Sequence, residues 1–353
     1  MVSARAVARA AVVAAMVLLA VGGAAFGQTH APWPTDWNNW NDPALWVTVG
    51  NPGNAADTRY ATPGFGAVPY TYRIGKFEVT AGQYTAFLNA VAATDTYGLY
   101  NTNMDTAVDS HGCNIKRTGS SGSYTYRVPW EWSHRPVNYV SWGDAARFAN
   151  WLHNGQLTEA QNAGTTEDGA YFLNGATSNA ALVGVRREAD WKWAIASEDE
   201  WYKAAYHKND GVTDHYFDYP TGSDSVPSKA LGNPIDPGNN ATFSGNDSTI
   251  GNPSHCTDVG DHENSGSPYG TFDQAGNVWE WNEAELGPFR CFRGGPFVSD
   301  EEYLRADQHN FDNPTEENPA LGFRVSEVPE PATMALLALG GLALLRRRRG
   351  ASS

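Results

Sequence analysis

The chain has 353 residues, a formal net charge of −15, and 36 Gly, 16 Tyr, 13 Trp and three Cys. Without its two charged end segments the net charge is about −20, and so acidic a surface argues against nucleic acid as a partner. The roughly 300 residues between the ends permit one large domain or two modest ones, and the abundance of aromatic and glycine residues predicts a loop-rich fold.

The N-terminal segment 1–27 predicts a cleavable signal peptide. Arg5 and Arg9 make its start positive, and an apolar run follows to about residue 25. Ala25-Phe26-Gly27 then places small residues at the cleavage positions, so cleavage before Gln28 is expected. The alternative is an uncleaved N-terminal anchor, although the apolar run is short for a membrane span.

Local patterns predict one strand and three helices in the first two thirds of the chain. A polar, proline-containing lead-in (28–69) precedes 70–80, whose β-forming residues predict a strand. Thr80, Ser141 and Ser197 each stand before apolar residues at helical spacing and predict helix N-termini. The last two have an acid three residues on, as in a capping box. Polar, Gly-rich and Asn-rich segments predict loops at 95–127, 154–180 and 209–273.

Candidate catalytic groups are few. The cysteines are Cys113, Cys256 and Cys291. In an exported protein they permit one disulfide, whose pairing stays open, and leave at least one thiol over. No Cys-x-x-Cys, Gly-x-Ser-x-Gly, P-loop or zinc-protease motif is present.

Histidines and paired acids give a second, weaker set of candidates. Three histidines could approach one another in space but are interpreted as scattered surface residues: His255, His262 and His309. Glu301-Glu302 and Glu316-Glu317 lie in polar segments and are interpreted as solvated faces rather than catalytic pairs.

The C-terminus has three parts in order: Pro329-Glu330-Pro331, the apolar run 332–345, and Arg346-Arg347-Arg348-Arg349. At about 1.5 Å per residue the apolar run barely crosses a bilayer core, and the arginines would keep its end cytoplasmic. Segment 328–350 thus resembles the PEP-CTERM sorting signal of exopolysaccharide-producing Gram-negative bacteria. The resemblance implies transient anchoring in the inner membrane, recognition by an exosortase, and delivery to the cell surface or extracellular matrix. A plain C-terminal anchor is the alternative.

Seven motifs occur in a fixed order between residues 70 and 325. They are Ile74-Gly-Lys-Phe-Glu-Val-Thr80, Arg135-Pro-Val-Asn-Tyr-Val-Ser-Trp142, Ser197-Glu-Asp-Glu-Trp201, Tyr219-Pro-Thr-Gly222, Gly270-Thr-Phe-Asp-Gln-Ala-Gly-Asn-Val-Trp-Glu-Trp281, Arg293-Gly-Gly295 and Gly322-Phe-Arg324. The set resembles the formylglycine-generating enzyme, or sulfatase-modifying factor, family. The resemblance implies one domain at 70–326 with a loop-rich α+β fold, related to C-type lectins and containing little regular secondary structure.

The same resemblance indicates that the catalytic cysteines of the family are absent from this chain. In active family members two cysteines after the Gly-Gly motif bind copper or engage the substrate cysteine. The matching positions here are Ser299 and Leu304. Leucine can neither ligate a soft metal nor exchange thiols, and Cys291 lies on the other side of Gly294-Gly295. We therefore assign no catalytic residue and do not expect copper.

A structural calcium site is expected instead. Carried over from the family, its ligands are the side chains of Asp273 and Glu280 and the carbonyls of Gly276 and Val278, all oxygen donors that suit a hard cation. A second family calcium site would begin at Asn240 and the Ala241 carbonyl, with Asp247 as a further candidate. The alternative for the first site is an empty turn held by tryptophan packing, with Trp279 and Trp281 in the core.

Two functions remain in competition. The first is a non-catalytic binding or structural module that contacts exopolysaccharide or matrix proteins outside the cell. The second is a formylglycine-generating oxidase or another metal-dependent oxidoreductase. Substitution of both cysteine positions favours the first.

Overall fold

The computed structural model describes most of the chain between residues 34 and 328, namely residue 34 and residues 36–231, 237–244, 249–251 and 254–328. The expected signal peptide and the sorting segment from Pro329 onward lie outside the described residues. The helices are η1 (Pro43–Leu45), α1 (Ala81–Val91), η2 (Thr102–Met104), α2 (Trp130–Ser133), α3 (Trp142–His153), α4 (Asn179–Val183), α5 (Glu198–Tyr206) and η3 (Glu301–Leu304). The strands are β1 (Trp46–Val49), β2 (Tyr72–Gly75), β3 (Lys116–Thr118), β4 (Thr125–Arg127), β5 (Trp193–Ile195), β6 (Trp279–Leu286), β7 (Phe289–Arg293), β8 (Asn310–Asp312), β9 (Leu321–Phe323) and β10 (Val325–Glu327).

The three predicted helix starts are confirmed, and each uses a complete capping box. The side chains of Thr80, Ser141 and Ser197 accept from the backbone N–H three residues on. The side chain at that third position accepts from the backbone N–H of the cap in return. Because both partners lie within one turn, the sequence alone is enough to specify these starts.

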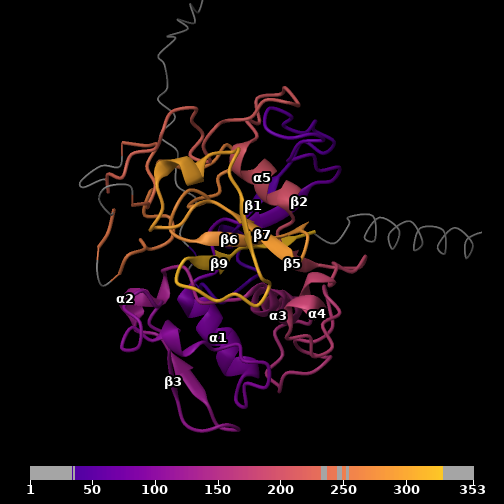
Figure 1. Ribbon diagram of the computed structural model, residues 1–353, viewed down its shortest axis with the longest axis vertical. Coiled ribbons are helices and arrows are strands. Elements are labelled where there is room, and N and C mark those ends of the chain that lie inside the picture. Colours follow the sequence, from indigo (N-terminus) through magenta and orange to yellow (C-terminus); the bar gives the residue numbers. More distant parts are fainter. Residues whose placement is uncertain (1–33, 35, 232–236, 245–248, 252–253, 329–353) are drawn as a thin grey trace, which may run out of the picture. The chain divides into compact units, whose positions relative to one another are not determined.

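Two four-stranded sheets organise the described part of the chain. The first has the order β1-β2-β10-β5 with antiparallel pairing throughout. The second has the order β8-β7-β6-β9, in which β6 and β9 are parallel. β9 and β10 are separated only by Arg324, so this residue joins the two sheets. Figure 1 shows α1 and α3 on one side of these strands and α5 on the other.

Two parts of the fold differ from the sequence expectation. The lead-in contributes β1, in which Trp46 pairs with Gly75 of β2, and therefore belongs to the first sheet. Segment 95–127 was expected to be a loop but contains the hairpin of β3 and β4. These strands are only three or four residues long, too short to stand out in the sequence, and each is held by pairing with a partner strand.

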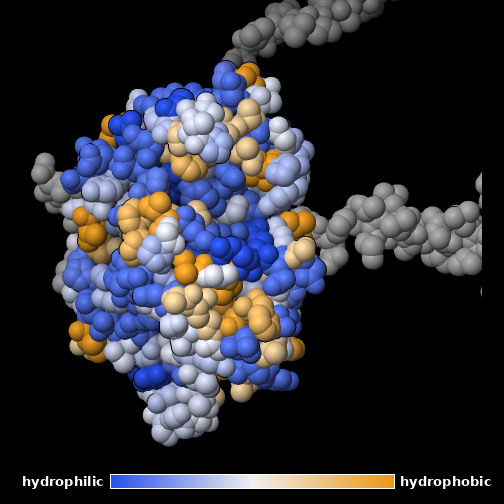
Figure 2. All heavy atoms as spheres, turned by 45° about the vertical axis from the view of Figure 1, so that its right-hand side comes forward, coloured by the Kyte–Doolittle hydropathy of each residue, from blue (hydrophilic) through white to orange (hydrophobic). Residues whose placement is uncertain are grey.

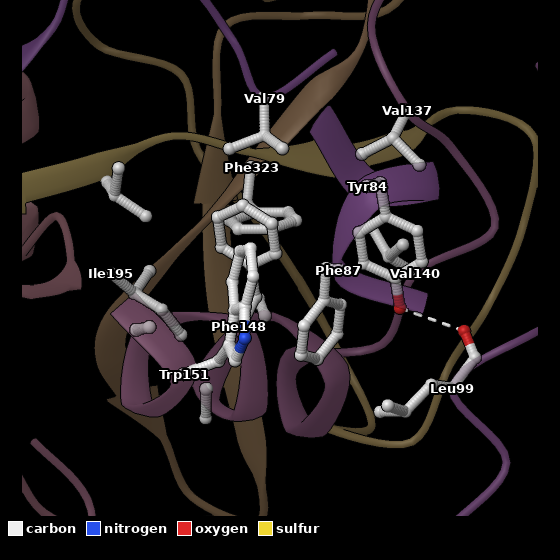
Figure 3. Packing of buried hydrophobic residues seen from close by; sticks show 14 of the residues in the cluster. Val79, Tyr84, Phe87, Leu99, Val137, Val140, Phe148, Trp151, Ile195 and Phe323 are labelled. Carbon is white, nitrogen blue, oxygen red and sulfur yellow. Dashed lines mark hydrogen bonds between the residues drawn. The ribbon is translucent and has the colours of Figure 1, made fainter. Parts of the chain in front are cut away.

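The main apolar core lies where α1 and α3 meet the sheets. Phe87 of α1, Phe148 of α3 and Phe323 of β9 point toward one another (Figure 3), and the ring of Phe148 meets the other two edge-on. The hydroxyl of Tyr84 donates to the Leu99 carbonyl at 2.8 Å, which satisfies its only polar atom within this core. Trp279 and Trp281 belong to the same cluster, so their interpretation as core residues is confirmed.

The described residues contain no helix long and apolar enough to span a membrane. The face shown in Figure 2 is largely hydrophilic, with hydrophobic residues in small groups between polar ones.

Candidate functional site

The four predicted calcium ligands lie in the turn before β6 and at the start of that strand. Asp273, Gly276 and Asn277 all adopt positive φ, which lets the chain reverse tightly just before the strand. The Asp273 Oδ2 atom accepts from the Gly260 N–H at 2.5 Å. Neither the Gly276 nor the Val278 carbonyl accepts a hydrogen bond from a described residue. Both carbonyls thus keep the acceptor capacity that a hard cation requires.

Glu280, the fourth predicted ligand, has other partners. Arg324 Nε donates to its Oε2 at 2.5 Å, and Arg324 Nη2 donates to its Oε1 at 2.6 Å. The Trp201 indole N–H also donates to Oε2, at 2.7 Å. Oε1 therefore has one donor and can still share a lone pair, whereas Oε2 is saturated.

Glu78, which is not among the predicted ligands, adds a third acid to this region. It is only 2% exposed, and neither carboxylate oxygen has a hydrogen-bond partner among the described residues. Burial, together with the charges of Asp273 and Glu280, raises the pKa of Glu78 well above its usual range. Glu78 lies in the Ile74-to-Thr80 motif, where an isolated acid among apolar residues was the signal that could have identified it.

Charge balance favours a cation here. Glu78, Asp273 and Glu280 are all buried, Asp273 and Glu280 both act electrostatically on Glu78, and Arg324 acts on all three. Burial raises the pKa of Asp273 to about 7, partly offset by the Gly260 N–H. Isolated buried carboxylates are costly unless protonated or paired. The donors fit calcium, with Glu280 contributing only through Oε1.

The fit depends on carbonyls as well as carboxylates. Within the described ranges, no group of three or more His, Cys, Asp or Glu side chains is arranged around a common metal position. The predicted calcium site has only two carboxylates, so the absence of such a group is compatible with it. A site built from side chains alone is not favoured.

The second expected calcium site is less complete. The side-chain oxygen of Asn240 accepts from the Ser228 hydroxyl at 2.5 Å, and the Ala241 carbonyl accepts from the Thr249 hydroxyl at 3.3 Å. Asp247 lies outside the described residues. The site stays a prediction.

The two substituted cysteine positions lie at opposite ends of one short segment. Ser299 is partly exposed just before η3, and its carbonyl accepts from the Ser244 N–H at 2.9 Å. Leu304 ends η3 and is completely buried. It packs with Tyr219, Phe243 and other apolar residues. The Leu304 side chain therefore anchors this segment to the core and offers neither a ligand nor a nucleophile.

The existing cysteines do not replace the missing pair. All three are free thiols and all are buried. Burial raises the pKa of Cys113 to about 11 and that of Cys291 to about 12, and it raises the pKa of Cys256 as well. Since the thiolate is the nucleophile and the metal ligand, thiols with raised pKa values are inert near neutral pH.

The histidines and paired acids match the sequence prediction only in part. His255 stacks on His111 with ring centroids 4.4 Å apart, His309 contacts Phe65, and His262 shares a hydrogen bond with the Thr242 hydroxyl. The three therefore have separate surroundings, but His262 is buried rather than on the surface. Glu301 and Glu302 are exposed as expected, whereas Glu317 is partly buried and binds the Asn101 side chain.

Comparison with known families decides the assignment of the domain. The profile of the sulfatase-modifying factor enzyme 1-like domain matches residues 6–328, which is most of the chain. The chain belongs to this family. Its mixed helices and sheets with long connecting loops are the α+β fold that the resemblance implied. The relation to C-type lectins and the exact domain boundaries stay predictions.

Solved structures of similar proteins include three with low sequence identity. CarF is 19% identical over 81% of this chain and 98% of its own, with a TM-score of 0.46. Treponema denticola variable protein 1 is 18% identical over 80% of this chain and 95% of its own, with a TM-score of 0.47. PvdO from Pseudomonas aeruginosa is 17% identical over 80% and 94%, with a TM-score of 0.40. No curated protein matches the chain.

The C-terminal segment also has a family match. The PEP-CTERM protein-sorting motif matches residues 327–349. This family member is therefore an exported protein and a substrate for exosortase processing. Transient anchoring through 332–345 and removal of the signal peptide stay predictions, because both segments lie outside the described residues.

Proposed function

We propose that the chain is a non-catalytic binding module that is delivered to the cell surface or the extracellular matrix and attaches there to polysaccharide. The observation that carries the proposal is the complete burial of Leu304 in an apolar cluster, at a position where active relatives need a cysteine. A soft metal ion or a thiol-exchange reaction has no donor at that position.

The sorting motif supports the polysaccharide part of the proposal. PEP-CTERM signals accompany exopolysaccharide production, so the exported domain would meet that polymer first. The acidic charge of the domain agrees with a partner other than nucleic acid. Matrix proteins are the alternative partner.

Calcium has a structural place in the proposal. Asp273, the Gly276 and Val278 carbonyls and Oε1 of Glu280 would hold the ion. Bound there, it would compensate buried carboxylate charge and tie the turn to β6. The copper chemistry of active relatives has no place in this arrangement.

Binding to the polymer can be measured directly. The purified domain, residues 28–328, is mixed with exopolysaccharide from a strain that produces it, and the complex is sedimented. We expect the domain to be retained at physiological salt. Free domain in the supernatant at every polymer concentration would overturn the proposal.

The competing oxidoreductase function predicts a different metal content. Metal analysis of the domain after purification without chelator should find calcium and no stoichiometric copper or iron. Stoichiometric copper or iron would favour the oxidoreductase and count against a binding module.

A further inference from the structure

A cavity of about 310 Å³ opens beside the β6–β7 hairpin. The segment after α4 forms one wall, with Arg186 and Arg187, and strands β6 and β7 form another, with Glu283, Glu285 and Arg290. None of these residues belongs to the turn that holds the predicted calcium ligands or to the segment with Ser299 and Leu304. The cavity is therefore a separate candidate site.

The floor of the cavity is rigid. Trp142 and Tyr171 are completely buried, and the Arg290 guanidinium lies over the Trp142 ring at 3.9 Å. Arg290 also donates to several backbone carbonyls, among them that of Val185 at 2.5 Å. Its Nε is buried and has no partner among the described residues. Arg290 therefore holds the floor in place, while its Nε is itself enclosed and out of reach of a ligand.

The charged groups of the lining are paired with one another. Arg187 donates to Glu283 at 2.7 Å and pairs with Glu200 at 2.9 Å, and Arg186 pairs with Glu285. Arg290 pairs with Glu285 as well, so every charged group in the described lining already has a partner of opposite sign, and an ionic ligand would have to compete with these pairs. The cavity therefore favours a neutral ligand that is rich in hydrogen-bonding groups.

Unused acceptors and donors remain for such a ligand. The Oε1 atom of Glu283 accepts two hydrogen bonds, one from the Tyr171 hydroxyl at 2.5 Å and one from Arg187 Nε at 2.7 Å. Its Oε2 atom can accept from a ligand hydroxyl. The Arg186 side chain is 63% exposed at the rim, and the donors that its guanidinium does not use on Glu285 and nearby carbonyls can reach a ligand oxygen. An acceptor on Glu283 and a donor on Arg186 match the hydroxyl groups of a sugar ring, each of which can both donate and accept.

We propose that this cavity binds a neutral saccharide of one or two rings. Its volume lies at the small end of the roughly 300–1,000 Å³ seen for ligand pockets, which suits a short terminal segment rather than a long stretch of polymer. The inference rests on the proposed function and names its ligand class. Glu283 and Arg186 would supply the hydrogen bonds that select the sugar.

Ligand-observed NMR with the full domain tests the inference. The probes are glucose, galactose, mannose, their disaccharides, and glucuronate as a charged comparison. We expect a neutral sugar to bind, and we expect Arg186→Ala and Glu283→Gln each to weaken that binding about tenfold, the effect of losing one good hydrogen bond to a charged group. Lys208→Ala, which removes an exposed ion pair with Asp224 outside the cavity, should leave binding unchanged.

The outcomes separate this inference from the proposed function. Sugar binding that survives both cavity variants, tighter binding of glucuronate than of any neutral sugar, or no sugar binding by a domain that still sediments with polysaccharide would each overturn the cavity assignment alone. Failure of the unmodified domain to sediment with polysaccharide would overturn the proposed function. Because Glu283 is largely enclosed, the melting temperature of the Glu283→Gln variant is measured first to check that it is folded. If that variant is unfolded, the result for Arg186→Ala, at an exposed position, is decisive.

Discussion

Arg324 and Glu280 form a bidentate ion pair in which neither side chain is accessible to solvent. The pair connects the loop between β9 and β10 to β6 in the second sheet. Arg324 also donates to the carbonyls of Gly75, at 2.9 Å, and Phe272, at 2.9 Å. One side chain therefore joins both sheets to the turn that leads into β6, which explains why the Gly-Phe-Arg motif matters for the fold.

Arg324→Met should destabilise the domain strongly. The substitution leaves the Glu280 carboxylate buried without its base, which typically costs about 3–5 kcal/mol in the free energy of unfolding. Urea denaturation with chelator present measures the loss. As a control, Lys208→Met breaks an exposed pair and should cost at most about 1 kcal/mol. Equal losses in the two variants would contradict the structural role of Arg324.

Gly276→Ala should be far more damaging than Gly287→Ala. Both glycines have positive φ, so alanine is strained at each by about 1–2 kcal/mol. At Gly276 the new Cβ would also overlap the Thr242 carbonyl oxygen, whereas at Gly287 nothing lies within 4 Å. Thermal melting in chelator should show the larger loss at Gly276, with the overlap adding about 1–3 kcal/mol. Similar losses would mean that the loop containing Thr242 can move aside.

The stability of the domain should fall with rising pH because of Glu317. Burial, followed by the charge of Asp144, raises the pKa of Glu317 to about 8. Between the usual glutamate pKa and this value the folded state binds more protons than the unfolded state, so ionisation destabilises the fold as pH rises. Glu317→Gln removes this loss and should gain stability relative to the unmodified domain, on the order of 2 kcal/mol, between pH 5 and pH 8.

Urea denaturation at a series of pH values measures this difference. Glu302→Gln is the matched control, since Glu302 is exposed in the same polar C-terminal part of the domain. Its stability should follow that of the unmodified domain at every pH. A Glu317→Gln curve parallel to that of the unmodified domain would rule out the raised pKa as a cause of the slope.

Calcium should raise the melting temperature over that of chelator-treated domain. A ligand at 100 times its dissociation constant stabilises the folded state by about 2.7 kcal/mol. Asp273→Ala should abolish most of the response, while Asp210→Ala, at an exposed position, should keep it. If the melting temperature were the same in calcium and in chelator, both predicted calcium sites would be excluded.

Much of the fold could be predicted from the sequence where the determinants are local. The caps at Thr80, Ser141 and Ser197 and the β-forming run at 70–80 are local in this sense, and all correspond to elements of the structure. β1 was missed because its four residues, Trp46–Val49, are too few to stand out within the polar lead-in, although their composition favours a strand. Short strands of this kind take their conformation from a distant partner.

In the candidate site, too, the local features could be predicted and the long-range contacts could not. The turn at Asp273 to Glu280 was recognisable as a motif, but the orphan carboxylate of Glu78 and the pairing of Glu280 with Arg324, 44 residues away in the sequence, were not. Glu317 was misinterpreted as solvated because its neighbour Asp144 comes from α3. The cavity beside the β6–β7 hairpin also combines residues from distant segments, so no single motif reveals it.

The most direct test of the account is a peptide conversion assay. The purified domain is incubated with a sulfatase-type Cys-x-Pro-x-Arg peptide, copper and oxygen, and the peptide is analysed by mass spectrometry beside an active family member. Because Leu304 is buried apolar and the three thiols are buried with raised pKa values, we expect the peptide to keep its cysteine. Conversion of that cysteine to an aldehyde would contradict the conclusion that this family member has lost the oxidase chemistry.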